Sequence, residues 1–163
     1  MPVVRLLGIT MLLALLVPTG ARAAGGEDHG NSHPHHLGVF LGAGLETKRD
    51  GREEDKGFAA GLEYEYRFHK KWGVGGVFET LGGETIREIS LVVPVSFHPG
   101  GGWRLFAGPG YEFTEQKDKP LLRLGVGYEF HARNWTIAPE FIADSVSGGA
   151  VIWIAGVAFG FGF

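Results

Sequence analysis

Hydrophobic and polar positions alternate along most of the chain beyond residue 36. In residues 58–68 one face would carry Phe58, Ala60, Leu62, Tyr64, Tyr66 and Phe68, and the other would carry Ala59, Gly61, Glu63, Glu65 and Arg67. Residues 121–130 and 153–163 divide in the same way. A period of two is typical of β-strands whose faces meet different environments. One face is apolar and aromatic, and the other carries glycine and scattered charge.

The same pattern predicts eight strands. Their ranges are about 37–47, 57–68, 72–80, 86–97, 103–114, 120–130, 135–144 and 149–163. Each reaches or exceeds the roughly 9 to 11 residues with which a tilted strand crosses a membrane. Tight turns follow the second, fourth and sixth strands, and segments such as 47–56 and 115–120 follow the others. We therefore expect an all-β, antiparallel, up-and-down arrangement.

The sizes of the two faces decide which of them points inward. An eight-stranded barrel has an interior only just wide enough for side chains. The face that carries tryptophan, tyrosine, phenylalanine and leucine is too bulky for that interior, whereas the glycine-rich face fits. The sequence therefore predicts an eight-stranded antiparallel transmembrane β-barrel with its aromatic face in lipid, rather than a water-soluble barrel with an apolar core.

A phenylalanine, a histidine, a short insert and a tryptophan recur at residues 68–72, 97–103 and 130–135. Aromatic residues at strand ends form interfacial girdles in membrane barrels. The predicted girdle consists of Phe68, Trp72, Phe97, Trp103, Phe130, Trp135 and Phe163. We expect the histidines of the repeat, His69, His98 and His131, to lie in turns at the membrane surface.

Residues 37–163 resemble the small outer-membrane β-barrel proteins of Gram-negative bacteria, the eight-stranded OmpA/OmpX-like class. The most specific part is the C-terminal VAFGFGF, residues 157–163, which is similar to the terminal strand signal of that class. The resemblance implies recognition by the barrel-insertion machinery, a periplasmic N-terminus and contact with outer-membrane lipid and lipopolysaccharide. Three prolines, Pro94, Pro109 and Pro139, fall inside predicted strands, where we expect β-bulges.

The N-terminal residues predict export. Residues 1–23 have a basic start, an apolar run and a small-residue cleavage site, which are typical of a secretory signal peptide, and Pro18 interrupts the run that a membrane anchor would need. Their removal would take away Arg5 and Arg22 and no acidic residue, so the net charge would change from −3 to −5. This charge does not favour a nucleic-acid partner. The sequence has no cysteine, so disulfides do not contribute.

A polar, histidine-rich segment follows at residues 24–36, and we expect it to be disordered. Its candidate metal ligands are His29, His33, His35 and His36. Imidazole-rich tracts bind zinc, nickel or copper. Because no fixed ligand spacing is present, the alternative is a periplasmic tail with incidental histidines.

Charged residues on the predicted inward face form two groups. Carboxylates at the extracellular mouth of the lumen would be Glu46, Glu79, Glu88, Glu112 and Asp144. The remaining residues, Glu63, Glu65, Arg67, Arg104, Arg123, Glu129 and Glu140, would form a salt-bridge network. Arg123 is the nearest inward cation to the mouth, and it would create a salt-bridged lid there. The alternative at the mouth is a Ca²⁺ or Mg²⁺ site, since hard cations take oxygen ligands.

The sequence favours a non-enzymatic barrel with a closed, salt-bridged interior and a structural or surface-interaction role. Apart from a divalent cation, it suggests no cofactor. A small porin-like channel is the alternative, with the inward charges lining a cation pathway. A lipid A-modifying enzyme is the third hypothesis. It would need a nucleophile and its base in contact, but Ser145 and Ser147 are predicted at the opposite end from the histidines.

Overall fold

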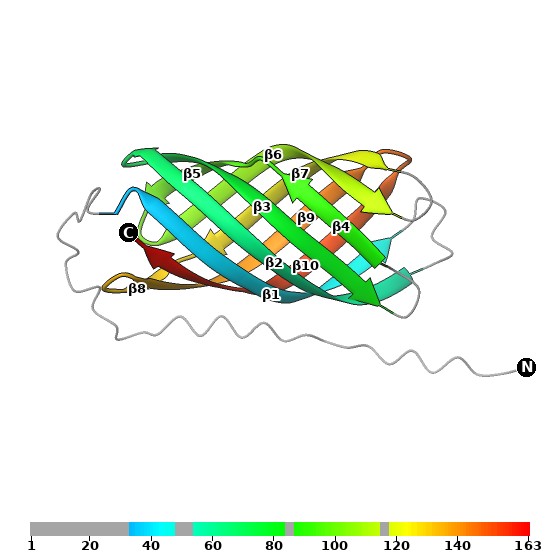
Figure 1. Cartoon of the computed structure of the whole chain (residues 1–163), viewed down its shortest axis with the longest axis horizontal. Helices are drawn as coiled ribbons and strands as arrows, with labels where there is room; N and C mark the ends of the chain where they lie inside the picture. The colour runs from blue at the N-terminus through cyan, green and yellow to red at the C-terminus, as the bar shows by residue number, and fades with distance from the viewer. Residues whose placement is uncertain (1–32, 48–53, 84–86, 115–117) are drawn as a thin grey trace, which may run out of the picture.

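The computed structural model describes residues 33–47, 54–83, 87–114 and 118–163, so the predicted signal peptide and most of the histidine-rich segment lie outside the described residues. The strands are β1 (His35–Thr47), β2 (Glu54–His69), β3 (Trp72–Gly83), β4 (Arg87–Val92), β5 (Val95–Gly100), β6 (Trp103–Thr114), β7 (Lys119–Tyr128), β8 (Phe130–Ala132), β9 (Trp135–Val146) and β10 (Ala150–Gly162). Figure 1 shows them winding around one barrel. No helix among the described residues is long and apolar enough to cross a membrane.

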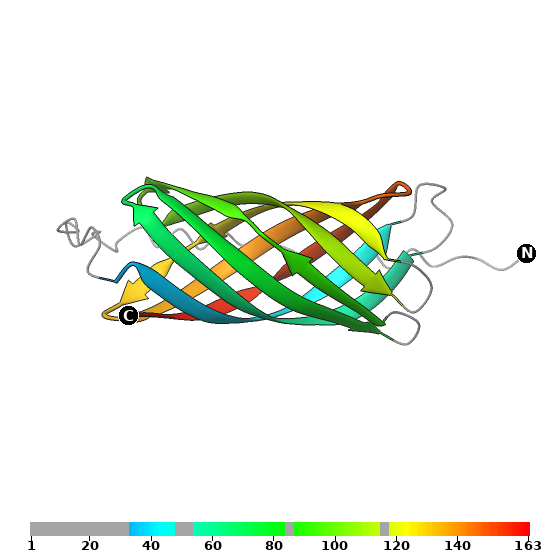
Figure 2. The same ribbon diagram turned by 45° about the horizontal axis from the view of Figure 1, so that its top comes forward.

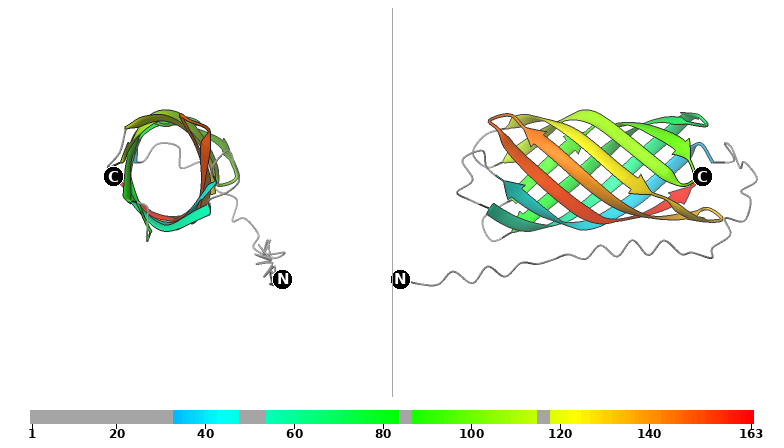
Figure 3. Two further views of the ribbon diagram at one scale, coloured as in Figure 1. Left: turned by 90° about the vertical axis from the view of Figure 1, so that its right-hand side faces the viewer. Right: turned by 180° about the vertical axis from the view of Figure 1, so that it is seen from behind.

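These ten segments form eight antiparallel strands. Segments β4 and β5 both pair with β3 and β6, and β7 and β8 both pair with β9. The sheet closes because β10 pairs with both β9 and β1, in a register that runs from His36 opposite Gly162 to Thr47 opposite Val151. The closed ring is visible end-on in Figure 3. The predicted eight-stranded, antiparallel, up-and-down barrel is confirmed.

The barrel is inverted relative to a water-soluble protein. Large apolar side chains on its outer surface are exposed, for example Leu62 at 54% and Leu124 at 54%. Charged side chains in the lumen are buried, with Glu79 at 2% and Arg123 at 1%. A continuous apolar surface of this kind is not stable in water but matches a bilayer core. The alternation along each strand therefore sorts residues between lipid and lumen, as the sequence predicted.

The strand lengths fit a membrane. Strands β3, β6 and β9 each have 12 residues, which corresponds to roughly 40 Å of extended chain. At a tilt of about 40° this chain spans roughly 30 Å, the thickness of the hydrocarbon core. Figure 2 shows that the strands are inclined to the long axis of the barrel.

Two phenylalanines fill the middle of the lumen, which the sequence had assigned to glycine and charge. Phe40 is fully buried and Phe106 is 5% exposed. A Cβ atom at Gly42 or Gly156 would collide with the Phe40 ring, and one at Gly125 would collide with the Phe106 ring. These glycines therefore make room for inward aromatic rings as well as keeping the lumen narrow. The buried apolar cluster also contains Ala59, Val77, Leu81, Val92, Leu121, Ala138, Ile142, Val146, Ile152, Ile154 and Ala158.

The β-bulges predicted at the three prolines are absent, and that prediction is wrong. Pairing across Pro109 and Pro139 continues without a shift of register. At Pro94 the assigned strand breaks between β4 and β5, yet the pairing with β3 and β6 has the same register on both sides. The Gly75 N–H donates to the Pro94 carbonyl at 2.9 Å. A proline removes one donor, and the remaining ladder bonds hold the register.

Aromatic side chains encircle the end of the barrel that carries the short turns. Exposed fractions of the predicted girdle include 54% for Phe68, 61% for Trp135 and 54% for Phe163. Several of these rings contact an aromatic neighbour on the next strand, such as Trp72 with Phe97, whose centroids are 4.7 Å apart. Phe163 lies at this end, beside the start of β1 (Figure 1). It stacks on His35, with centroids 5.5 Å apart.

Candidate functional site in the barrel lumen

The first group of buried charges is the central ion-pair cluster, formed by Arg123 on β7, Asp144 on β9 and Glu79 on β3. Arg123 Nε donates to Asp144 Oδ1 at 2.8 Å, and Nη2 donates to Asp144 Oδ2 at 2.6 Å. Nη2 also donates to Glu79 Oε1 at 2.7 Å. Asp144 lies directly opposite Arg123 in the β7–β9 ladder, whereas Glu79 reaches it from the far side of the lumen. Arg123 therefore ties together opposite walls of the barrel.

The other predicted mouth carboxylates lie on the loop side of this cluster. Glu112 is buried, and its Oε1 lies 3.7 Å from the Lys119 Nζ. Glu46 and Glu88 are half-buried at strand ends. Arg123 pairs with two of the five carboxylates, but this pair lies deeper than the mouth, so the salt-bridged lid stays a prediction. The Ca²⁺ or Mg²⁺ site at the mouth stays a prediction.

The second group is the turn-end cluster, formed by Glu63, Glu65, Arg67, His98, Arg104, Glu129 and Glu140. Arg104 on β6 occupies its middle, and its Nη1 donates to Glu140 Oε1 at 2.9 Å and to Glu63 Oε2 at 3.2 Å. Arg67 Nη2 donates to Glu129 Oε1 at 2.7 Å. The Arg104 guanidinium also lies 4.7 Å from the centroid of the Phe106 ring. The cluster therefore rests on the apolar layer in the middle of the lumen.

His98 corrects the prediction that all three repeat histidines lie in surface turns. It is 8% exposed, and its Nε2 lies 2.8 Å from Glu65 Oε1 within hydrogen-bonding distance. Its Nδ1 lies 3.7 Å from Glu129 Oε2. The reason is register: β5 continues through Gly100, so His98 occupies an inward position of a strand. His69 and His131 are exposed at the turns, and His131 Nε2 lies 3.4 Å from Glu129 Oε2.

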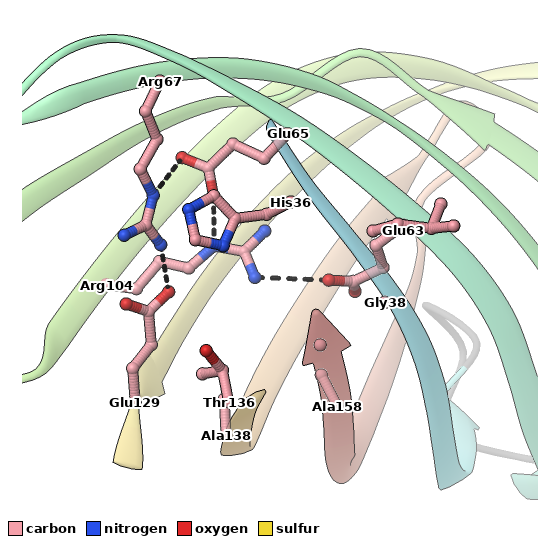
Figure 4. A pocket seen from close by; sticks show the side chains of 12 residues that line it. His36, Gly38, Glu63, Glu65, Arg67, Arg104, Glu129, Thr136, Ala138 and Ala158 are labelled. Atoms are coloured by element: carbon pink, nitrogen blue, oxygen red, sulfur yellow. Dashed lines mark hydrogen bonds and ion pairs between the residues drawn. The ribbon is translucent and has the colours of Figure 1, made fainter. Parts of the chain in front are cut away.

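A small cavity of about 40 Å³ lies among the side chains of the turn-end cluster. Its lining consists of His36, Leu37, Gly38, Glu63, Glu65, Arg67, Arg104, Glu129, Thr136, Ala138, Ala158 and Gly160. Figure 4 shows the carboxylates of Glu65 and Glu129 beside the two guanidiniums, with His36 close to them. A hollow of this size holds an ion or a few water molecules and no larger ligand.

The four histidines predicted as metal ligands do not converge within the described chain. His29 lies outside the described residues. His35 and His36 belong to β1, which begins two residues earlier than predicted, and successive strand residues face opposite sides. His35 Nδ1 lies 2.8 Å from the Tyr64 hydroxyl on the outer surface, whereas His36 lines the lumen cavity. His33 and His36 both pack beside Gly162. A metal site in this segment stays a prediction.

Within the described ranges, one group of three side chains brings potential metal-ligand atoms together, and it is Glu65, His98 and Glu129. One atom from each lies within 4.8 Å of the others, and all three residues are buried. Sequence reasoning placed both glutamates in the lumen but missed His98. The alternation of residues 86–97, continued by one more residue, would have found it.

The serines considered for catalysis are separated from the histidines. Ser145 is exposed on the outer face of β9, and Ser147 is exposed in the β9–β10 turn at the loop end. His69 and His131 lie at the opposite end of the barrel. A serine nucleophile and its base must be within hydrogen-bonding reach, so these residues do not form a hydrolytic pair.

Solved structures with a similar fold include small outer-membrane barrels. Neisserial surface protein A aligns with a TM-score of 0.62 over 80% of this chain and 97% of that chain, at 10% sequence identity. For the N-terminal β-barrel domain of Pseudomonas aeruginosa OprF the TM-score is 0.54, with 77% and 97% coverage and 15% identity. For Ail, the attachment invasion locus protein of Yersinia pestis, the TM-score is 0.51 over 77% of this chain and 98% of that chain, at 21% identity.

At these identities the similarity concerns the fold. The chain has the fold of the small eight-stranded outer-membrane barrels. Neither a protein-family model nor a curated protein matches the sequence.

Proposed function

We propose that this chain is a non-enzymatic barrel of the bacterial outer membrane, with a structural or surface-interaction role and a lumen closed to solutes. The observation that carries the proposal is the filled lumen. The central ion-pair cluster and the turn-end cluster each cross it, and Phe40 and Phe106 fill the space between them. Side chains from opposite walls therefore meet at three successive levels.

A small channel is the second candidate, because the lumen contains more carboxylates than guanidiniums and would select cations. Conduction would require the Arg123 and Arg104 ion pairs to open together with the aromatic layer. The hollow at the turn end, about 40 Å³, is too small to act as a pathway by itself. The packing therefore favours the closed barrel.

Planar-bilayer recording of the purified protein tests this proposal. We expect no steady conductance from the wild type. Arg123→Ala should also remain closed, because the Arg104 pairs and the two phenylalanine rings still block the lumen. A reproducible, cation-selective conductance of the wild type would overturn the closed-barrel proposal in favour of the channel.

Lipid A modification is the third candidate, and mass spectrometry tests it directly. Lipid A from cells that express the chain should have the same mass as lipid A from cells without it. A mass shift, such as the loss or gain of an acyl chain, would contradict a non-enzymatic role.

The proposed orientation places the N-terminus, the short turns and Phe163 in the periplasm and the longer loops at the cell surface. The outer surface would contact lipid and lipopolysaccharide, and the terminal strand would be recognised by the barrel-insertion machinery. The absence of cysteine allows a clean test. In intact cells a membrane-impermeant maleimide should label Ser147→Cys at the loop end and leave Lys71→Cys at the turn end unlabelled. The reverse labelling would invert the orientation.

A further inference from the structure

We propose that Glu65, His98 and Glu129 form a buried site for one divalent transition-metal ion, such as Zn²⁺, at the turn end of the lumen. The three side chains come from β2, from β5 and from the short link between β7 and β8. Each offers an atom within 4.8 Å of the other two. One imidazole and two carboxylates are a donor set suited to Zn²⁺ and to neighbouring divalent metals.

A bound ion would require a small rearrangement, because the two carboxylates lie beside different nitrogens of the His98 ring. His98 Nε2 lies 2.8 Å from Glu65 Oε1, and His98 Nδ1 lies 3.7 Å from Glu129 Oε2. Around a tetrahedral Zn²⁺ with bonds near 2.0–2.2 Å, ligand atoms are separated by roughly 3.3 Å. A single ion takes one ring nitrogen, so one of the two glutamates would turn toward the nitrogen that the other already faces. One ligand atom from each residue already lies within 4.8 Å of the others.

The charge of the cluster supports a divalent cation. Four carboxylates, those of Glu63, Glu65, Glu129 and Glu140, face two guanidiniums, those of Arg67 and Arg104. With a neutral His98 the buried cluster therefore carries two excess negative charges. An uncompensated buried charge is costly. One divalent ion would balance the cluster, and the alternative is the uptake of two protons.

Polar atoms around the site lack partners, which indicates that the cluster is incomplete. Ser96 is 1% exposed, lies two residues before His98 on the same inward face, and its Oγ has no hydrogen-bond partner. Ser96 pairs with Gly73 in the β3–β5 ladder, and the Glu65 carboxylate lies over Gly73. Glu140 Oε2 is also buried without a partner. Buried polar groups are normally satisfied, and an ion with its coordinated water would supply contacts here.

The surroundings leave space and a direction of entry. The cavity of about 40 Å³ touches Glu65 and Glu129, and His36 lines it from the start of β1. Arg67 occupies Glu129 Oε1, which leaves Oε2 on the side of His98 and the exposed His131. Among the described residues, His33, His35, His36, His69 and His131 all lie at this end of the barrel. His36, which lines the cavity, and His131, whose Nε2 lies 3.4 Å from Glu129 Oε2, are the ones next to the buried site.

Metal titration of the full chain, folded in detergent and stripped with EDTA, tests the proposal. The triple variant His29→Gln, His33→Gln and His35→Gln removes competing ligands of the N-terminal segment. In this background we expect one Zn²⁺ per barrel by calorimetry and a visible Co²⁺ spectrum of a low-symmetry site. Adding His98→Gln or Glu129→Gln should weaken binding by at least about tenfold, whereas adding His69→Ala at the turn should leave it unchanged.

Heat-modifiable gel mobility would show whether each variant is folded. A folded triple variant that binds no Zn²⁺ or Co²⁺ would overturn the proposal and leave protons as the balancing charge. Zn²⁺ affinity that is the same in folded His98→Gln would also overturn it. If the ligand variants do not fold, the triple variant still decides, because a bound ion should raise its thermal midpoint and EDTA should reverse the increase. A thermal midpoint that does not change when Zn²⁺ is added would count against the site.

Discussion

At the scale of single residues, Arg123 shows how a charge is kept inside a barrel. Its guanidinium is 1% exposed, and donates to two carboxylates from opposite walls at 2.6–2.8 Å. Such an arrangement is not strongly stabilising by itself, because desolvation offsets the attraction. Removing one partner is different, since it leaves the others buried and uncompensated.

Arg123→Ala should therefore lower the free energy of unfolding by about 3–5 kcal/mol. Denaturant unfolding of the barrel in detergent, followed by tryptophan fluorescence, measures this change. Lys119→Ala is the matched control, because Lys119 is 38% exposed in its side chain and its contact with Glu112 is 3.7 Å long. We expect less than about 1 kcal/mol there. Equal stability of Arg123→Ala and wild type would refute the ion-pair account of the lumen.

Glycine also allows the backbones of neighbouring strands to approach closely at Gly108. A Cβ atom at Gly108 would collide with the backbone of Val93 and Pro94, whereas one at Gly76 would meet nothing within 4 Å. Backbone cannot move aside as a side chain can, so Gly108→Ala should destabilise the barrel by about 1–3 kcal/mol. Gly76→Ala should be close to neutral in the same unfolding experiment. If the two variants behaved alike, the close approach of β6 to the β4–β5 junction would be irrelevant to stability.

The sequence could predict which residues face the lumen, because a strand has a period of two. It could not predict their partners, since Glu79 meets Arg123 only when the sheet closes. For His98 the sequence predicts a turn, because a proline and three glycines follow it and these residues are typical of turns. The phenylalanines at 40 and 106 were missed for a related reason, since the space for their rings comes from glycines on neighbouring strands.

At the scale of strands, alternation indicated the elements and their faces correctly, but not the effect of proline. Each proline inside a strand predicts a β-bulge. Instead the ladder loses one donor and continues, because the paired strands on both sides impose the same register. Local sequence therefore predicted the strands, and pairing with neighbours decided how an irregular residue is accommodated.

The outward assignment of the apolar face predicts a cost that depends on depth. Leu62 lies near the middle of β2 and is 54% exposed. Leu62→Arg should cost about 2–4 kcal/mol in a bilayer, and Phe68→Arg near the end of the same strand about 0–1 kcal/mol. Reversible folding into liposomes with a urea titration provides the comparison. Equal costs at the two positions would indicate that the outer face of β2 does not cross a hydrocarbon core.

The last residue should be needed for assembly. The Phe163 N–H donates to the His35 carbonyl at 2.9 Å, and its ring stacks on His35, where β10 closes onto β1. Deleting Phe163 should leave the protein in the periplasm and reduce its outer-membrane yield, as measured by fractionation and immunoblotting. Phe163→Tyr, which keeps the ring, should assemble normally. A normal yield of the deletion variant would contradict a role in insertion or closure.

At the scale of the whole molecule, the chain is an inverted barrel that needs a bilayer for its outer surface and ion pairs for its interior. The closed sheet and its apolar outer surface could be predicted from alternation and side-chain volume. The three-level filling of the lumen could not, because it depends on contacts between strands far apart in the sequence.

Gel mobility of the outer-membrane fraction, compared with and without boiling, tests whether the chain is a closed barrel embedded in the membrane. A closed barrel resists detergent until it is heated, so the unboiled protein should be found in that fraction and migrate differently from the boiled protein. Recovery of the protein in the soluble fraction, or identical mobility before and after boiling, would contradict a membrane-embedded closed barrel.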